Sequence, residues 1–274
     1  MAASSGKSLT VAVAGLGAVG MPVVQRLAAG IPGLALVAVA ARDAARAAQR
    51  LKAASIDVPV LPLAELARRA DIVVEALPAA QFRAVAEPAI DATRIFVPIS
   101  VGALLDHLDL VDRAAATGAR IIVPTGALLG LDAVRAAAEG AISSVRMITR
   151  KPPAGLEGAP YLVEHGISLR GLNTPRKVFE GTAREGARGF PANVNVAAAL
   201  ALAGIGPDRT RLEIWADPAI DRNTHSIELE ADSVRFRMTI ENVPSAENPR
   251  TGRLTPLSVI ACLRGLVAPL RVGS

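Results

Sequence analysis

A glycine-rich segment near the start of the chain has residue types and spacing suited to binding phosphates: Gly15-Leu-Gly17-Ala-Val-Gly20. Gly15 permits a tight turn, Gly17 lets the backbone approach a ligand because it has no Cβ, and Gly20 lets a following helix pack on the preceding strand. Backbone N–H groups at the helix start, including those of Ala18 and Val19, would hold a pyrophosphate with the help of the helix dipole. The segment predicts a dinucleotide site; the alternative is a glycine-rich turn without a ligand.

Four further residues follow predicted strands, at positions where a nucleotide could lie. Arg42 and Asp43 come after the second apolar run. An acidic residue at this point binds the ribose 2′-hydroxyl of NAD, whereas an arginine can accept the 2′-phosphate of NADP, so both cofactors stay open. Leu77 and Pro78 follow the run Asp71–Ala76, and we expect them to contact the cofactor as well.

Histidine titrates near neutral pH without strong tuning, and the chain has three histidines. His225 follows a polar loop and is in phase with Ile227 and Leu229, so its side chain is expected to point inward at the mouth of a strand. It is either the acid–base group of a dehydrogenase, with an ordinary pKa of about 6.5, or a hydrogen-bonded core residue. We expect His107 to lie on a surface helix and His165 to lie in a loop.

Two polar segments could contact a cofactor or a substrate. Asn193 and Asn195 precede an alanine-rich helix, where asparagines act as caps but also offer the donor and acceptor that suit a nicotinamide carboxamide. The segment Thr149-Arg-Lys-Pro-Pro153 carries cations that either bind a carboxylate or face water. The expected substrate contacts are Asn193, Lys151 and Arg222, with Arg150 as another candidate for the carboxylates.

The elements that would position these residues change character along the chain. In the first half, short apolar runs alternate with alanine-rich helical stretches, which is typical of a parallel sheet with covering helices. After about residue 140, apolar and polar residues alternate in the predicted strands, which is typical of half-buried strands. The segment His225–Ile240 is predicted to form a hairpin in which Glu228 and Glu230 meet Arg235 and Arg237. The expected strands include Leu9–Ala14, Leu34–Ala40, Asp71–Ala76, Ile95–Val97, Arg120–Val123, Ser144–Thr149 and Arg211–Ala216, and the expected helices include Ala44–Ala53, Pro62–Arg69, Gln81–Pro88, Ala103–Thr117 and Leu254–Leu270.

These patterns predict an α/β fold with an N-terminal Rossmann dinucleotide-binding domain and a C-terminal α+β domain for catalysis and dimerisation. We place the first domain at residues 1–135 and the second at residues 136–251. The helix within residues 252–274 is expected to pack back on the first domain.

Composition narrows the classes of function. The chain has 274 residues, a formal net charge of +5 and only 3% aromatic residues. Its arginines are scattered and stacking residues are scarce, which argues against a nucleic-acid partner. Cys262 is the single cysteine and lies in an apolar run, so we expect an inert buried thiol, no internal disulfide and no metal site. No apolar run has the length of a membrane span, and we expect a cytoplasmic protein.

Several C-terminal segments resemble the L-aspartate dehydrogenase family. They are Gly189-Phe-Pro-Ala-Asn-Val-Asn195, Arg222-Asn-Thr-His225, Ile240-Glu-Asn-Val-Pro-Ser245 and Asn248-Pro-Arg-Thr-Gly252. The resemblance spans nearly the whole chain, and these motifs are more specific than the glycine-rich turn. It implies reversible, NAD(P)-dependent oxidation of L-aspartate to iminoaspartate, which hydrolyses to oxaloacetate and ammonia, and a role of the imine in NAD biosynthesis.

The resemblance also implies roles for single residues. It places the catalytic histidine at His225 and cofactor contacts at Ala127 and Asn195. It further implies a homodimer that uses the sheet of the second domain, on the expectation that one face of that sheet exposes apolar residues. Two alternatives stay open: an NAD(P)-dependent oxidoreductase acting on another small amino or hydroxy acid, and a non-catalytic NAD(P)-binding sensor.

Overall fold

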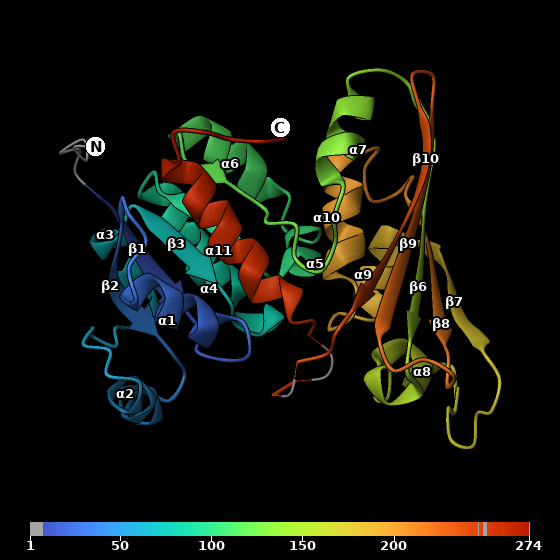
Figure 1. Cartoon of the computed structure of the whole chain (residues 1–274), viewed down its shortest axis with the longest axis horizontal. Helices are drawn as coiled ribbons and strands as arrows, with labels where there is room; N and C mark the ends of the chain where they lie inside the picture. The colour runs from blue at the N-terminus through green and yellow to red at the C-terminus, as the bar shows by residue number, and fades with distance from the viewer. Residues whose placement is uncertain (1–7, 246, 249–250, 274) are drawn as a thin grey trace. The chain divides into compact units, whose positions relative to one another are not determined.

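The structure is a computed structural model that describes residues 8–245, 247–248 and 251–273. The chain divides into two compact units (Figure 1). The first comprises the residues up to Ser100, His107–Pro124 and Pro256–Arg271, and the second comprises Val101–Asp106, Thr125–Thr255 and the residues after Arg271. The domain boundaries expected from the sequence, after residues 135 and 251, stay a prediction.

A five-stranded parallel sheet forms the centre of the first unit. Continuous apolar runs suit its strands because helices cover both faces of a parallel sheet. The predicted Rossmann-like sheet is confirmed, with small differences at the strand ends. The strands are β1 (Leu9–Ala14), β2 (Leu34–Ala40), β3 (Ile72–Glu75), β4 (Ile95–Pro98) and β5 (Arg120–Ile121), in the order β2-β1-β3-β4-β5.

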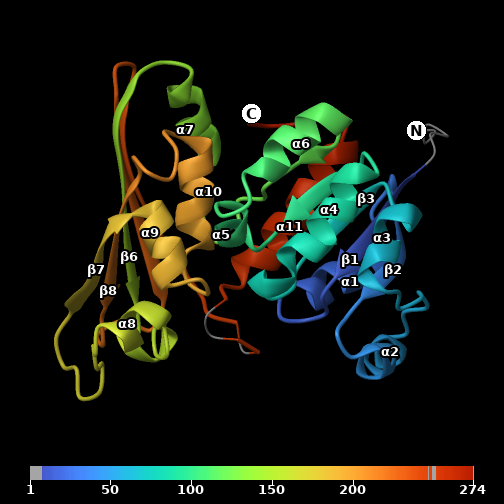
Figure 2. The same cartoon turned by 180° about the vertical axis from the view of Figure 1, so that it is seen from behind.

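Helices cover the two faces of this sheet. Figure 1 shows α1 (Gly20–Ala28) and α11 (Leu254–Val267) on one face, and Figure 2 shows α4 (Phe82–Asp91) and α6 (Asp109–Thr117) on the other. The unit also contains α2 (Ala44–Ala53), α3 (Leu63–Arg69) and the short 3-10 helix η1 (Ala79–Gln81).

The single helix expected over Ala103–Thr117 is wrong, because the chain forms two helices there. α5 (Val101–Leu104) belongs to the second unit and α6 belongs to the first, so the chain passes from one unit to the other between them. Leu104 and Leu110 are both buried, but in different units. Apolar spacing records that a residue is buried, and it does not record which unit buries it.

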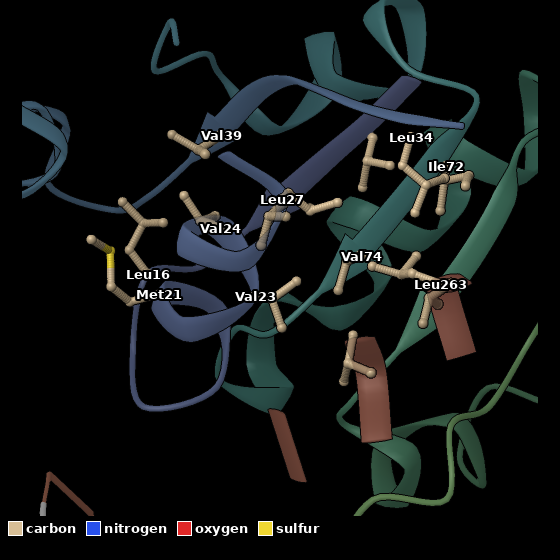
Figure 3. Packing of buried hydrophobic residues seen from close by; sticks show 14 of the residues in the cluster. Leu16, Met21, Val23, Val24, Leu27, Leu34, Val39, Ile72, Val74 and Leu263 are labelled. Carbon is tan, nitrogen blue, oxygen red and sulfur yellow. The ribbon is translucent and has the colours of Figure 1, made fainter. Parts of the chain in front are cut away.

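A hydrophobic core lies on the face of the parallel sheet that α1 and α11 cover (Figure 3). Val23 and Leu27 of α1 pack in the same cluster as Ile72 of β3. Val259 and Leu263 of α11 belong to this cluster too and are fully buried. The last helix of the chain therefore supplies side chains to the core of the unit that begins the chain.

The second unit contains a mixed five-stranded sheet in which β6 and β8 are parallel and the other neighbours are antiparallel. In both views its helices α7, α9 and α10 lie on one side of the sheet (Figures 1 and 2). The strands are β6 (Ile142–Lys151), β7 (Arg176–Thr182), β8 (Arg211–Ala216), β9 (Asn223–Ala231) and β10 (Arg235–Asn242), in the order β10-β9-β6-β8-β7. The helical elements are α7 (Leu131–Ala138), η2 (Pro153–Gly155), α8 (Pro160–Glu164), α9 (Ala183–Gly189) and α10 (Asn195–Ala203).

The predicted hairpin is confirmed as β9 and β10. Arg235 lies opposite Glu230 and Arg237 lies opposite Glu228, and each pair forms an ion pair. Such cross-strand pairs favour this register, because a slip of one residue would move every side chain to the other face.

The face of this sheet turned away from its helices carries charged and hydroxyl side chains, apart from Ile148 and Trp215. Arg146 pairs with both Glu213 and Glu228 across three strands. The Arg150 guanidinium lies 4.7 Å from the ring centre of Trp215. The expectation that this face exposes apolar residues is therefore wrong, because the strands alternate buried apolar positions with outward charge pairs.

Candidate cofactor and acid–base sites

The glycine-rich turn of the first unit has the geometry expected of a phosphate cradle. Gly15 has φ +101°, and a Cβ there would lie 2.3 Å from the Ala76 carbonyl oxygen. A Cβ on Gly20 would lie 1.8 Å from the Gly15 carbonyl oxygen. A Cβ on Gly17, in contrast, would meet no atom within 4 Å. Gly15 and Gly20 are thus required by the fold, whereas Gly17 leaves open space where a pyrophosphate could approach the backbone.

The start of α1 suits an anion as well. Val19 is the N-cap residue and its side chain makes no capping hydrogen bond. The first turn carries no acidic residue. Ala18 and Val19 therefore present backbone N–H groups and the positive end of the helix dipole without a competing carboxylate from the helix itself. The residues present here fit the pyrophosphate of NAD or NADP.

Glu75, at the end of β3, is a buried carboxylate that the sequence analysis missed. Its oxygens accept hydrogen bonds from the backbone N–H of Leu77 at 2.8 Å and of Ser100 at 3.0 Å, and from the N–H of Ile99 at 3.2 Å. The Ser100 Oγ lies 3.0 Å from the same carboxyl. Burial raises the pKa of Glu75, and these hydrogen bonds lower it by less. The sequence signal that could have indicated this buried carboxylate is an acidic residue at the end of an otherwise apolar strand.

Glu75 ties together the ends of two neighbouring strands, β3 and β4. It thereby fixes Leu77, which lies against the turn: a Cβ on Gly15 would be 3.2 Å from the Leu77 Cδ2. Pro78 follows and is the N-cap residue of η1. Of the two residues predicted as cofactor contacts, Leu77 therefore lies beside the glycine-rich turn, and Pro78 follows it on the segment held by a buried carboxylate.

Arg42 and Asp43 lie between β2 and α2, and both are exposed. Asp43 is the N-cap residue of α2, and its Oδ1 accepts the Arg46 N–H at 2.9 Å. Arg50, which the sequence analysis did not single out, donates to the Leu16 carbonyl oxygen at 2.6 Å. Helix α2 therefore supports the glycine-rich turn from a second direction.

His225 lies on β9 in the second unit and is only 3% exposed. As predicted, it is in phase with Ile227 and Leu229 on the buried side of the strand. Its Nδ1 lies 3.1 Å from the Oγ1 of Thr149, the residue opposite it on β6. Burial, and to a smaller extent the charge of Lys151, lower the pKa of His225 to about 3. The expectation of an ordinary pKa is wrong, since the imidazole is desolvated and near a cation, and it is neutral at pH 7.

Lys151 and Asn193 form the second polar pair on this buried side. The Lys151 Nζ donates to the Asn193 Oδ1 at 2.7 Å, and both residues are less than a tenth exposed. Within the described part of the chain, Lys151 is the only fully buried lysine or arginine. Thr149 and Lys151 are two residues apart on β6 and so point to the same face as His225.

The other two cations predicted near the substrate lie elsewhere. Arg150 points to the opposite side of the sheet, beside Trp215 and 3.4 Å from Asp217. Arg222 precedes β9 with a side chain that is 50% exposed, and it lies 4.0 Å from Asp221. The structure therefore brings Lys151, but neither arginine, to the buried face that carries His225.

Asn195 and Ala127 are both held by hydrogen bonds within the second unit. The Asn195 Oδ1 accepts the Gly102 N–H at 2.9 Å. The N-cap residue of α10 is Val194 and has no side-chain cap, so the alternative that Asn193 or Asn195 caps this helix is wrong. The Asn242 Nδ2 donates to the Ala127 carbonyl oxygen at 2.9 Å, a contact that sequence reasoning missed.

The remaining candidates play no part in these sites. His107 lies between α5 and α6 rather than on a helix, and its ring stacks on Phe82 at 5.9 Å. His165 is exposed at the end of α8, with its ring 3.9 Å from Tyr161. Burial raises the pKa of Cys262 to about 11, which makes it an unreactive thiol.

Two classes of site are missing from residues 8–245, 247–248 and 251–273. No group of three or more His, Cys, Asp or Glu side chains there is placed to hold a metal ion. None of the helices in that part of the chain combines the length and the hydropathy of a membrane span.

Comparison with known proteins identifies the family. Residues 132–266 match the model described as the C-terminal domain of aspartate dehydrogenase, and residues 15–124 match the NAD-binding domain of homoserine dehydrogenase. The chain is 56% identical to an L-aspartate dehydrogenase of Bradyrhizobium diazoefficiens, over 99% of this chain and 96% of that one. It is 54% identical to L-aspartate dehydrogenase 3 of Bordetella bronchiseptica, over 99% and 100% of the two chains.

A solved structure shows the same fold. The crystal structure of aspartate dehydrogenase from Thermotoga maritima matches with a TM-score of 0.67 over 97% of this chain and 99% of that chain, at 24% identity. A scyllo-inositol dehydrogenase of Lactobacillus casei with bound NAD(H) matches with a TM-score of 0.52 over 97% of this chain and 91% of that chain, at 15% identity. With the two curated relatives above 50% identity over nearly the full chain, the chain belongs to the L-aspartate dehydrogenase family.

Proposed function

We propose that the protein oxidises L-aspartate with NAD⁺ or NADP⁺. The overall reaction is L-aspartate, NAD(P)⁺ and water giving oxaloacetate, ammonium, NAD(P)H and a proton, and it is reversible. It has two stages: removal of a hydride from Cα and a proton from nitrogen to give iminoaspartate, and hydrolysis of the imine. When bound, the nicotinamide supplies the hydride acceptor. Family membership and the paired polar groups on the buried face of the second sheet support this proposal.

His225 is the proposed acid–base group. The α-amine of aspartate is an ammonium at pH 7, and its nitrogen must lose a proton before its lone pair can form the C=N bond as hydride leaves. A neutral imidazole can accept that proton, and the same group can return a proton during attack of water on the imine carbon. The buried Lys151 ammonium would bind one carboxylate of the substrate, and Asn193 holds it in place.

Substrate binding is expected to strengthen His225 as a base. In the free protein, burial is the main cause of its low pKa and the Lys151 charge is the second. A carboxylate bound to Lys151 would offset that positive charge. The pKa of His225 would then rise toward the working pH only when a substrate with a carboxylate is present.

The cofactor contacts are proposals of the same kind. The glycine-rich turn, Gly15 to Gly20, would hold the pyrophosphate; Arg42 and Asp43 would meet the adenosine ribose, with Arg42 able to accept the 2′-phosphate of NADP. Leu77 and Pro78 would line the cofactor from β3. For Ala127 and Asn195, a contact with the cofactor is what the family resemblance implies.

Replacement of His225 tests the proposal. His225→Ala should lower kcat by roughly 10²–10⁴-fold, the usual range for a positioned acid–base group, while cofactor affinity stays close to normal. His165→Ala is the matched control, because this exposed histidine lies outside the site and should leave kcat unchanged. A folded His225→Ala enzyme with near-normal kcat at pH 7 would contradict the assignment.

A substrate panel separates the alternatives. Formation of reduced nicotinamide should be fastest with L-aspartate and far slower with malate or other small amino acids. Activity confined to another amino or hydroxy acid would identify a related oxidoreductase. Cofactor binding with no turnover of any member of the panel would identify a sensor.

We further propose a homodimer that uses the outward face of the second sheet. Arginines and glutamates are interleaved there, so a two-fold axis could bring an arginine of one copy to a glutamate of the other. Light scattering at micromolar concentration should give twice the mass of the chain. Reversal of one charge, as in Arg146→Glu, should lower the dimer fraction, and a monomer in the unmodified protein would exclude this proposal.

The imine could also leave before it is hydrolysed. We propose that iminoaspartate released in the cytoplasm feeds NAD biosynthesis. Turnover of ¹⁵N-labelled L-aspartate with cyanoborohydride and excess unlabelled ammonium should then yield labelled D-aspartate, because reduction of the free imine is not stereospecific. Recovery of no labelled D-aspartate would show that hydrolysis is complete before release.

A further inference from the structure

Thr149 is the one side chain that forms a hydrogen bond to His225 among the bonds resolved in the described residues. The two residues lie directly opposite each other on β6 and β9. Thr149 is 2% exposed and His225 is 3% exposed, so water does not compete for this contact. The distance between Thr149 Oγ1 and His225 Nδ1 is 3.1 Å, which is a hydrogen bond in a dry site.

We propose that Thr149 is a positioning residue whose hydroxyl oxygen accepts the Nδ1–H of His225 and so leaves Nε2 with the lone pair that takes the substrate's proton. This inference rests on the proposed role of His225 as the base. It adds a second residue to the acid–base machinery and names the reacting nitrogen.

The assignment follows from the chemistry of imidazole. A neutral ring carries one N–H, so a hydrogen bond from Nδ1–H to Thr149 leaves Nε2 free to accept a proton. The opposite arrangement, with the threonine hydroxyl donating to Nδ1, would put the proton on Nε2 and remove its lone pair. Base chemistry at Nε2 therefore requires Thr149 to be the acceptor.

The same hydrogen bond also supports the charged form. After Nε2 takes a proton, Nδ1–H is still a donor, so the bond to Thr149 is kept without any rearrangement. Burial opposes a positive charge on this ring, and an acceptor at Nδ1 offsets part of that cost. The hydrogen bond to Thr149 therefore favours a higher pKa of His225, whereas burial and the charge of Lys151 lower it.

Two substitutions separate the hydroxyl from the shape of the side chain. Thr149→Val keeps the branched shape but removes the acceptor, whereas Thr149→Ser keeps the hydroxyl. We expect Thr149→Val to lower kcat roughly 10- to 100-fold and to move the acidic limb of its pH profile to lower pH, with cofactor affinity unchanged. Thr149→Ser should restore most of the rate and the position of that limb.

Nitrogen NMR of ¹⁵N-histidine-labelled protein reads the tautomer directly. The unmodified protein at pH 7 should show a protonated, pyrrole-like Nδ1 and a pyridine-like Nε2 for His225. The Val variant should lose this preference. A pyridine-like Nδ1 in the unmodified protein, or a Val variant with an unchanged rate and pH profile, would overturn the inference.

The His225→Ala variant distinguishes an error in the role of Thr149 from an error in the proposed function. If His225→Ala is inactive while Thr149→Val behaves like the unmodified enzyme, only the role of Thr149 is wrong. If His225→Ala itself keeps its activity, the base is a different group and both assignments are wrong.

Discussion

In the proposed function, Lys151 has two effects that oppose each other: its charge would attract a dicarboxylate substrate, and the same charge lowers the pKa of His225. Lys151→Met removes the charge and keeps the length of the side chain. The pKa of His225 should therefore rise, although it should stay below its ordinary value because burial is the larger cause. An NMR titration of the histidine ring signals in the free protein measures this shift.

The same substitution should lower kcat/KM for aspartate roughly 10- to 100-fold, the loss expected for a charged hydrogen bond. Lys177→Met is the matched control: this lysine lies on the outward face of the same sheet, next to Trp215, and should have little effect. Equal kcat/KM values for the two variants would show that Lys151 binds no substrate carboxylate.

Arg42 decides the choice between cofactors if it meets a 2′-phosphate. It is exposed at the end of β2, and the Oδ1 of the neighbouring Asp43 accepts the Arg46 N–H at the start of α2. Arg42→Ala should weaken NADP binding by roughly 1.5–3 kcal/mol and NAD binding much less. Calorimetry with both cofactors measures the difference, with the exposed Arg26→Ala as a control. Equal losses for NAD and NADP would exclude a selective role.

The position of His225 was predictable from sequence, but its chemistry was not. Its spacing from Ile227 and Leu229, which share one face of the strand, placed it on the buried side of β9. Its pKa is lowered by burial and, to a smaller extent, by the charge of Lys151, and its ring contacts Thr149. Both residues are about 75 positions away in the chain and meet His225 through the β6–β9 pairing. Residue spacing within one strand carries no information on that pairing.

The glycine-rich turn shows how one short element divides its positions between fold and ligand. Gly17→Val should leave the fold intact, because its Cβ meets no atom within 4 Å, and should abolish most cofactor affinity by filling the space of the pyrophosphate. Gly20→Val should instead lower the free energy of unfolding, because its Cβ would lie 1.8 Å from a backbone oxygen. Calorimetry and thermal unfolding of both variants distinguish the two effects, and normal cofactor binding by folded Gly17→Val would refute the assignment.

Elements with a regular apolar pattern were predictable, and those defined by tertiary contacts were not. The bounds of β1, β2 and α2 agree with the sequence analysis, because each has a continuous run or a clear helical period. β7 was missed: its sequence, Arg176-Lys-Val-Phe-Glu-Gly-Thr182, is a polar edge strand defined by its pairing with β8. Glu75 was missed for the same reason, since three of its four donors belong to Ile99 and Ser100, which reach it only through the pairing of β3 with β4.

At the scale of the whole molecule, the proposed function assigns different chemistry to the two sheets. The parallel sheet uses its strand ends: the turn after β1 and the carboxylate that ends β3 are both at its carboxyl edge. In the mixed sheet, the proposed site is on the buried face, which carries Thr149, Lys151 and His225. The alternate positions of the same strands, such as Arg146 and Glu228, point to the opposite face. A buried polar side chain without a hydrogen-bond partner destabilises the fold. On this face Thr149 is paired with His225, and Lys151 is paired with Asn193.

The buried histidine should also set the acid stability of the protein. Because the pKa of His225 is about 3 in the folded protein and about 6.5 when unfolded, the unfolded chain takes up a proton that the folded one refuses. The stability present above pH 6.5 is therefore lost as the pH falls, by roughly 1 kcal/mol at pH 5.5. Urea unfolding at pH 7.5 and pH 5.5, compared with a His225→Gln variant that cannot titrate, isolates this contribution. The loss should be smaller in the variant by that amount, and equal losses would mean that His225 is protonated in the folded protein.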